Sequence, residues 1–119
     1  MEAKQLLETI VKAGDDKRAE DIVALDMHEV SLLADYFVIM NGNSERQVDA
    51  IVDAIEDAVL AAGGKQPRIE GKKGSRWMLM DFTDVVVHVF VPEERAFYNL
   101  EKLWSDAPLV DVDQWVSEA

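Results

Sequence analysis

Three aspartates are the residues of this chain best suited to metal chemistry. Asp81 and Asp84 flank a tight turn between two expected strands, and Asp35 opens an earlier strand. Grouped carboxylates hold Mg²⁺ in phosphoryl and nucleotidyl transfer. Because Asp81 and Asp84 lie on opposite sides of the turn, shared ligation depends on its geometry, and aspartates beside turns usually serve the turn. The structural role is the favoured interpretation, and a magnesium-dependent nucleotidyltransferase is the alternative.

His28 and His88 are the only histidines, and the chain has no cysteine. This composition argues against a structural zinc site and excludes thiol chemistry. A role for His88 as a general base requires an orienting carboxylate, and Asp81 is the conceivable neighbour across the hairpin. We favour a half-buried imidazole that bonds to a neighbour, or an interface residue. No catalytic residue, metal or cofactor is expected.

The segment Asn41-Gly42-Asn43-Ser44 precedes an amphipathic helix, where free amides can bind an anion. It lacks the glycine run and the lysine of a phosphate-binding loop. Ser44 followed by Gln47 matches a capping box, in which the two side chains satisfy free amides at the helix start. We therefore predict a helix cap and not an anion site.

Apolar spacing divides the chain into helices and strands. The expected order is a helix ending at Gly14, strands over 22–25 and 35–40, a helix between Ser44 and Gly63, an edge strand over 67–70, a hairpin over 77–91 and a helix from Pro92 to Trp104. In the last helix, one face is expected to carry Phe97, Leu100 and Trp104, and another Arg95, Tyr98 and Lys102.

This order predicts an α/β domain (α+β, with a mixed sheet) of about five strands, with helices mainly on one face. The domain is expected to span residues 1–105. Residues 106–119 form an acidic tail that we expect to be partly ordered at best, with Trp115 the residue best placed to dock.

Both faces of the hairpin over 77–91 are apolar, whereas a strand buried on one face only should alternate with polar residues. One face carries the valine row, Val85, Val87, Val89 and Val91. The other carries Trp77, Leu79, Asp81, Val86, His88 and Phe90. Cover for this second face can come from more of the chain itself, with Trp77 and Phe90 in the core, or from a partner. Aromatic residues beside a few polar groups are typical anchors of protein interfaces, so we expect the face to be left for a partner.

The chain is strongly acidic, with 24 acidic and 12 basic residues and a net charge of −12. This charge argues against general nucleic-acid binding and suits a basic protein partner. Five bases lie between Lys65 and Arg76, where they offer a local contact to RNA phosphate; a solvated loop is the alternative. The charged N-terminus does not fit a secretory signal, and no apolar run reaches the length of a membrane span. A cytoplasmic protein without a membrane contact is expected.

Several separate motifs, in order, carry a resemblance to a known family. They are the run from Ser31 to Val48, the Glu70-Gly71 pair, the hairpin from Trp77 to Val91 and the run from Glu94 to Trp104. Together they resemble the Iojap family, known in bacteria as the ribosomal silencing factor RsfS, over roughly residues 3 to 105. The resemblance implies a nucleotidyltransferase-like fold used without its chemistry: Gly42-Asn43-Ser44 interrupts the catalytic Gly-Ser loop, and no Asp-x-Asp pair follows.

The family resemblance implies a non-enzymatic translational repressor. Such a protein binds the large ribosomal subunit through large-subunit protein fourteen, blocks association with the small subunit and so prevents 70S formation. An acidic domain with an open sheet face matches a basic ribosomal protein.

On this resemblance, the binding role is expected of Trp77, Leu79, Asp81, His88 and Phe90, with Arg95 and Tyr98 as rim contacts. The choice of face rests on strand register, because a slip of one residue would exchange it for the valine row. The Lys65–Arg76 segment offers a contact to ribosomal RNA. The same apolar face is also a candidate for a homodimer contact, which would compete with ribosome binding.

Overall fold

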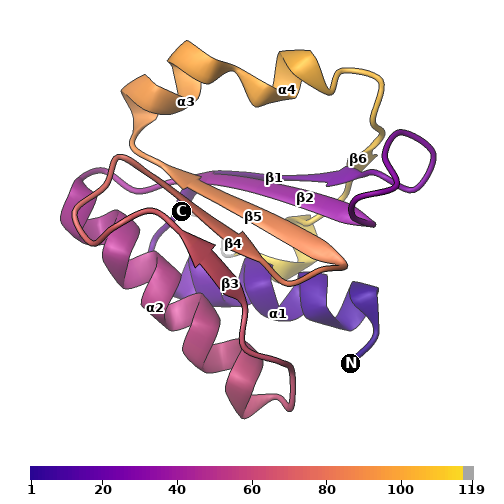
Figure 1. Ribbon diagram of the computed structural model, residues 1–119, viewed down its shortest axis with the longest axis horizontal. Helices are drawn as coiled ribbons and strands as arrows, with labels where there is room; N and C mark the ends of the chain where they lie inside the picture. Colours follow the sequence, from indigo (N-terminus) through magenta and orange to yellow (C-terminus); the bar gives the residue numbers. More distant parts are fainter. Residues whose placement is uncertain (117–119) are drawn as a thin grey trace.

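A six-stranded mixed sheet runs through the computed structural model, which describes residues 1–116 (Figure 1). The strands are β1 (Glu20–Asp26), β2 (Tyr36–Asn41), β3 (Arg68–Glu70), β4 (Trp77–Asp81), β5 (Val85–Phe90) and β6 (Leu109–Val110). Their order across the sheet is β3-β4-β5-β2-β1-β6, in which β2 and β5 are parallel and the other neighbours antiparallel. The predicted fold class is confirmed, although the sheet has a short sixth strand, β6, that was not predicted.

Two helices, α1 (Ala3–Asp16) and α2 (Glu45–Ala61), cover one face of the sheet (Figure 1). The predicted apolar stripe of α2 is buried, at Val48, Ile51, Val52, Ile55 and Val59. It packs in one core with the valine row and with Met78 and Met80. The valine row therefore belongs to the main core, as its uninterrupted apolar character predicts.

The start of α2 is capped as predicted. The Gln47 backbone N–H donates to Ser44 Oγ at 3.2 Å, and Gln47 Oε1 accepts from the Asn43 N–H at 2.7 Å. Gln47 Nε2 also donates to the carbonyls of Lys17 and Arg18, both at 3.1 Å. These bonds show that Ser44 and Gln47 cap the helix, and they also link the start of α2 to the end of α1.

The second face of the sheet is crossed by two short helices, α3 (Pro92–Tyr98) and α4 (Leu100–Leu103) (Figure 1). The two long helices lie on one face, as expected, but α3 and α4 cover part of the face that was expected to be left for a partner. The predicted single helix to Trp104 is interrupted at Asn99, whose backbone is in the left-handed conformation with φ 47°. Leu100 and Trp104 then pack on a second core of Leu25, Met27, Ala34, Phe37, Ile39, Phe90 and Ala107. Apolar side chains on this face need cover, and the chain supplies part of it.

The acidic stretch after residue 105 is more ordered than its composition suggests. Within residues 106–116, Val110 and Leu109 pair with Ala24 and Leu25 of β1. Val112 is 8% exposed, and Trp115, in the 3₁₀ turn η1 (Asp113–Trp115), packs against the main core. Residues 117–119 of the expected tail lie outside the described residues. None of the helices within residues 1–116 has the length and apolarity of a bilayer crossing.

Candidate partner-binding surface

The predicted register of the hairpin is confirmed. In the antiparallel pairing of β4 and β5, the opposed residues are Trp77 and Phe90, Leu79 and His88, and Asp81 and Val86. Directly opposed residues point to the same side of a sheet. The six residues predicted to share the second face therefore do so, and β3 adds Arg68 opposite Asp81 and Glu70 opposite Leu79.

Burial divides these residues into two groups. Phe90 is fully buried and His88 is 5% exposed, whereas Trp77, Leu79 and Asp81 are partly exposed. The expected direct contact of Phe90 and His88 with a partner is thus corrected: α3 and α4 cover this part of the face, so these two side chains support the surface from beneath.

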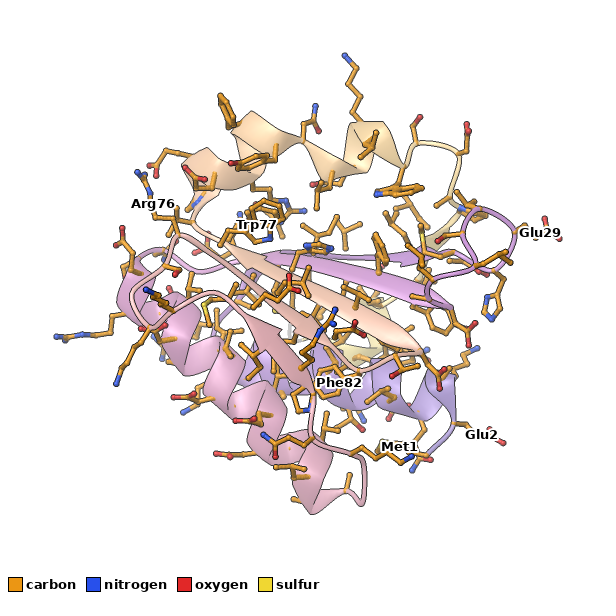
Figure 2. All side chains as sticks on the ribbon, in the orientation of Figure 1. Met1, Glu2, Glu29, Arg76, Trp77 and Phe82 are labelled. Atoms are coloured by element: carbon orange, nitrogen blue, oxygen red, sulfur yellow. The ribbon has the colours of Figure 1, made fainter. Side chains whose placement is uncertain are left out.

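Trp77 is the centre of an aromatic cluster on the α3 side of the sheet (Figure 2). Its ring stacks on Phe90, with centroids 5.0 Å apart and planes 24° apart, and contacts Tyr98 at 4.7 Å. The Trp77 indole N–H donates to His88 Nδ1 at 3.2 Å. Tyr98, at 46% exposure, lies at the outer edge of the cluster. Trp77 and Tyr98 are thus the members of this cluster that reach the surface.

His88 carries a neutral imidazole. Because Nδ1 accepts a hydrogen bond, its proton lies on Nε2, which is buried without a hydrogen-bond partner among the described residues. Burial lowers the pKa of His88 to about 4. Its polar neighbour is Trp77 and not Asp81, the carboxylate considered for a general-base pair. A buried imidazole without a carboxylate partner is not arranged for general-base catalysis.

The Asp81 side chain serves the turn, as favoured from the sequence, whereas the bonds of Asp84 are made by its backbone. The Asp81 carboxylate accepts from the Thr83 N–H at 2.8 Å and lies 3.3 Å from the Arg68 guanidinium. Thr83 is left-handed, with φ 74°. The carbonyl oxygen of Asp84 accepts from the Asp35 N–H at 2.8 Å. Within residues 1–116, no group of three or more His, Cys, Asp or Glu side chains is placed to hold a metal ion.

Arg95, expected at the rim of the interface, is instead an internal connector. Its side chain is only 11% exposed. It donates to the Asp21 carbonyl at 2.6 Å, to Asn41 Oδ1 at 3.0 Å and to Glu101 at 2.9 Å. These bonds fasten α3 and α4 to the ends of β1 and β2, which removes Arg95 from the contact surface.

The basic segment between Lys65 and Arg76 is partly neutralised. Arg76 pairs with Glu93 at 3.1 Å, and Arg68 pairs with Asp81. The Gly74 N–H donates to both carboxylate oxygens of Asp49, at 3.2 and 3.0 Å, so the loop is tied to α2.

Phe97 lies on the surface although it was not among the predicted contact residues. It is 80% exposed and contacts Tyr98 edge to face, with centroids 5.1 Å apart. Phe97 was predicted to share a helix face with Leu100 and Trp104, which requires a continuous helix from Pro92 to Trp104. Asn99 was the available signal, because Asn is one of the residues that end helices in the left-handed conformation. We call Trp77, Leu79, Asp81, Phe97 and Tyr98 the aromatic patch.

The fold and surface define a mixed α/β domain with an exposed aromatic patch on an acidic chain. A family model described as "Ribosomal silencing factor during starvation" matches residues 1–119. The chain belongs to this family, which confirms the predicted resemblance. Its members are named ribosomal silencing factors, so the family is one of ribosome-associated regulators of translation.

Individual relatives agree with this assignment. The chain is 54% identical over 113 residues to the ribosomal silencing factor RsfS of Bacillus subtilis (strain 168), covering 95% of this chain and 96% of that protein. It is 32% identical over 106 residues to "Mitochondrial assembly of ribosomal large subunit protein 1" of Mus musculus, covering 87% of this chain but 46% of that protein. A crystal structure from Bacillus halodurans is similar with a TM-score of 0.80 at 49% identity, over 91% of this chain and 98% of that one.

Proposed function

We propose that this chain is a non-enzymatic translational repressor that binds the large ribosomal subunit in the cytoplasm. In this proposal it docks on large-subunit protein fourteen and blocks association with the small subunit, so that 70S ribosomes do not form. Membership in the ribosomal silencing factor family is the observation that carries the proposal. The name of the mouse relative, which refers to the large subunit, points to the same half of the ribosome.

The aromatic patch is the proposed docking surface. Tyr98 and Phe97 are 46% and 80% exposed, and Trp77 beside them is held by stacking on Phe90. Aromatic side chains supply much of the binding energy at protein interfaces because they bury a large area at a small entropy cost. Ordering of Trp77 before binding lowers that cost further.

Charge is proposed to guide the encounter. The chain carries a net charge of −12, and Asp81 places a carboxylate within the patch. Complementary charge raises association rates and specificity more than affinity, and salt screens it. Binding to a basic ribosomal protein should therefore be faster at low salt.

Co-sedimentation with isolated large subunits tests this function. Wild type should pellet with the subunits, and Trp77→Ala and Tyr98→Ala variants should bind at least about tenfold more weakly. Leu60→Ala on α2, at 41% exposure and on the other side of the molecule, is the matched control and should bind like wild type. A wild-type protein that stays in the supernatant at low salt contradicts the proposal. A second assay, in which saturating protein reduces 70S formation from purified subunits, separates repression from mere binding.

Two accessory contacts belong to this proposal. The exposed Lys72 and Lys73 are proposed to touch ribosomal RNA beside the docking site, and their replacement by Ser should reduce the salt dependence of binding. The aromatic patch is also proposed to form a homodimer that competes with the ribosome. Sedimentation of wild type and Tyr98→Ala across concentrations tests this, because only wild type should dimerise.

A further inference from the structure

Two adjacent leucines stand out in the loop between β1 and β2. Leu32 and Leu33 are 104% and 80% exposed, which means that they make almost no contact with their own chain. Single exposed leucines are ordinary on protein surfaces, but neighbouring large apolar side chains fully in water are typical of interaction sites. We call residues 27–35 the leucine loop.

The leucine loop is held in one conformation at its base. Met27 is fully buried, Ala34 is 6% exposed, and the Met27 N–H donates to the Asp35 carbonyl at 2.8 Å. Nearer the tip, the Leu33 N–H donates to Ser31 Oγ at 3.0 Å. The backbone that presents the leucines is therefore ordered in advance, which lowers the entropy cost of binding.

His28 lies between two carboxylates, one at each end of the leucine loop. His28 Nδ1 lies 2.6 Å from Asp26 Oδ1, and His28 Nε2 lies 3.5 Å from Asp35 Oδ1. The hydrogen bond to Asp26 raises the pKa of His28. This arrangement links the two ends of the loop where β1 ends and β2 begins.

Acidic residues at the base of the leucine loop indicate the kind of partner. Asp26, Glu29 and Asp106 line one pocket together with His28, and Asp35 lies 3.5 Å from the His28 ring. Figure 2 shows Glu29 at the outer end of the loop. Phosphate backbones are repelled by these carboxylates, and a second copy would bring acids against acids on a chain of net charge −12. A basic protein surface with an apolar socket fits both features.

The leucine loop is continuous with the face that carries the aromatic patch. Met27 and Ala34 belong to the second core, together with Phe37 and Phe90 beneath the patch. The Asp35 N–H also bonds to the carbonyl of Asp84 in the β4–β5 turn, the turn that follows Asp81. Trp77 and Glu29 lie toward opposite ends of this face (Figure 2), so a partner that touches both the patch and the loop must span it.

We propose that Leu32 and Leu33 are a second anchor, separate from the aromatic patch, for a basic protein surface of the large ribosomal subunit. This inference rests on the proposed function. Its two leucines fill an apolar socket on the partner, while Glu29 and Asp106 meet basic side chains around that socket.

The test is the affinity of fluorescently labelled protein for isolated large subunits. The double variant Leu32→Ser/Leu33→Ser should keep the wild-type melting temperature, because both side chains are in water, and should bind about tenfold more weakly. Glu29→Lys should weaken binding at low salt and approach wild type at high salt. Leu60→Ser on α2 is the control for removing one exposed leucine.

Each outcome decides the inference. Wild-type affinity of the double variant, alongside loss of binding by Trp77→Ala, overturns the second anchor and leaves the proposed function standing. Tighter binding by Glu29→Lys overturns it too, because the partner surface would then be RNA or an acidic protein. A wild-type protein that does not bind large subunits removes the proposed function, and the anchor with it.

Discussion

The indole N–H of Trp77 donates to Nδ1 of His88 at 3.2 Å, diagonally across the β4–β5 pair. This bond fixes the proton of His88 on Nε2 and the orientation of Trp77 on the surface. A buried histidine thereby acts on the aromatic patch without touching a partner.

Removing the acceptor should release Trp77. In His88→Leu the indole N–H loses its partner, so its ¹H–¹⁵N resonance should shift and the affinity for large subunits should fall severalfold. His88→Asn places a side-chain amide near the Nδ1 position and should retain much of both. Three indole resonances are expected, one for each tryptophan, and Trp77→Phe assigns the relevant one. Unchanged Trp77 resonances in both variants would show that the bond does not control the ring.

The low pKa of His88 predicts a stability loss in mild acid. The pKa is about 4 in the native state against 6.5 for the ordinary group, so between these values the unfolded state binds more protons. Stability therefore falls as the pH drops from 6.5 toward 4, by about 3 kcal/mol in total at ~1.36 kcal/mol per pKa unit. Urea unfolding across this range should show a shallower dependence for His88→Leu. Parallel curves for the two proteins would contradict a neutral buried imidazole.

His28 should behave in the opposite way. Its hydrogen bond to Asp26 raises its pKa above 6.5, so its contribution to stability is present below 6.5 and is lost as the pH rises through the raised value. In an NMR titration His28 should titrate above 6.5 and His88 far below it. Asp26→Asn should move the pKa of His28 back down, and should leave that of His88 where it is.

Phe90 should behave as a core residue. Phe90→Ala leaves a cavity beneath α3 and α4 and should lower the free energy of unfolding by about 3–5 kcal/mol in urea denaturation. Phe97→Ala, at 80% exposure, is the matched control and should change stability by less than about 0.5 kcal/mol. A stable Phe90→Ala variant that fails only to bind subunits would return Phe90 to the contact surface.

Arg95 should matter for folding before binding. Arg95→Ala removes three hydrogen bonds and leaves the buried Asn41 without that donor, which should cost about 2–3 kcal/mol of stability. Arg46→Ala on the exposed side of α2 should stay within about 0.5 kcal/mol of wild type. Both values come from chemical denaturation. If Arg95→Ala lowered the free energy of unfolding as little as Arg46→Ala does, the structural role of Arg95 would be contradicted and a rim contact would be favoured again.

Much of the fold could be predicted because local spacing carries it. The stripe of α2 and the alternation in β4 and β5 repeat at short, fixed intervals, so each segment reports its own type. Ser44 and Gln47 are three residues apart and could be assigned to the cap for the same reason. The predicted sharing of one face by Trp77, Leu79 and Asp81 followed from the alternation alone.

The candidate site was only partly predictable, because its exposure depends on distant segments. Because the helix is interrupted at Asn99, Phe97 does not share a face with Leu100 and Trp104. Phe97 is exposed, whereas Leu100 and Trp104 pack on the second core. The segment of α3 and α4 covers His88 and Phe90, which were predicted from the sequence to be contact residues.

The sequence by itself determined which residues share each face of the hairpin, that both faces are apolar, and that the chain is acidic. Only the tertiary structure decided how the second face is covered, that Arg95 reaches Asn41, and that His88 bonds to Trp77. Strand and helix periods are local properties of the backbone, whereas burial and hydrogen-bond partners depend on contacts between segments far apart in the chain.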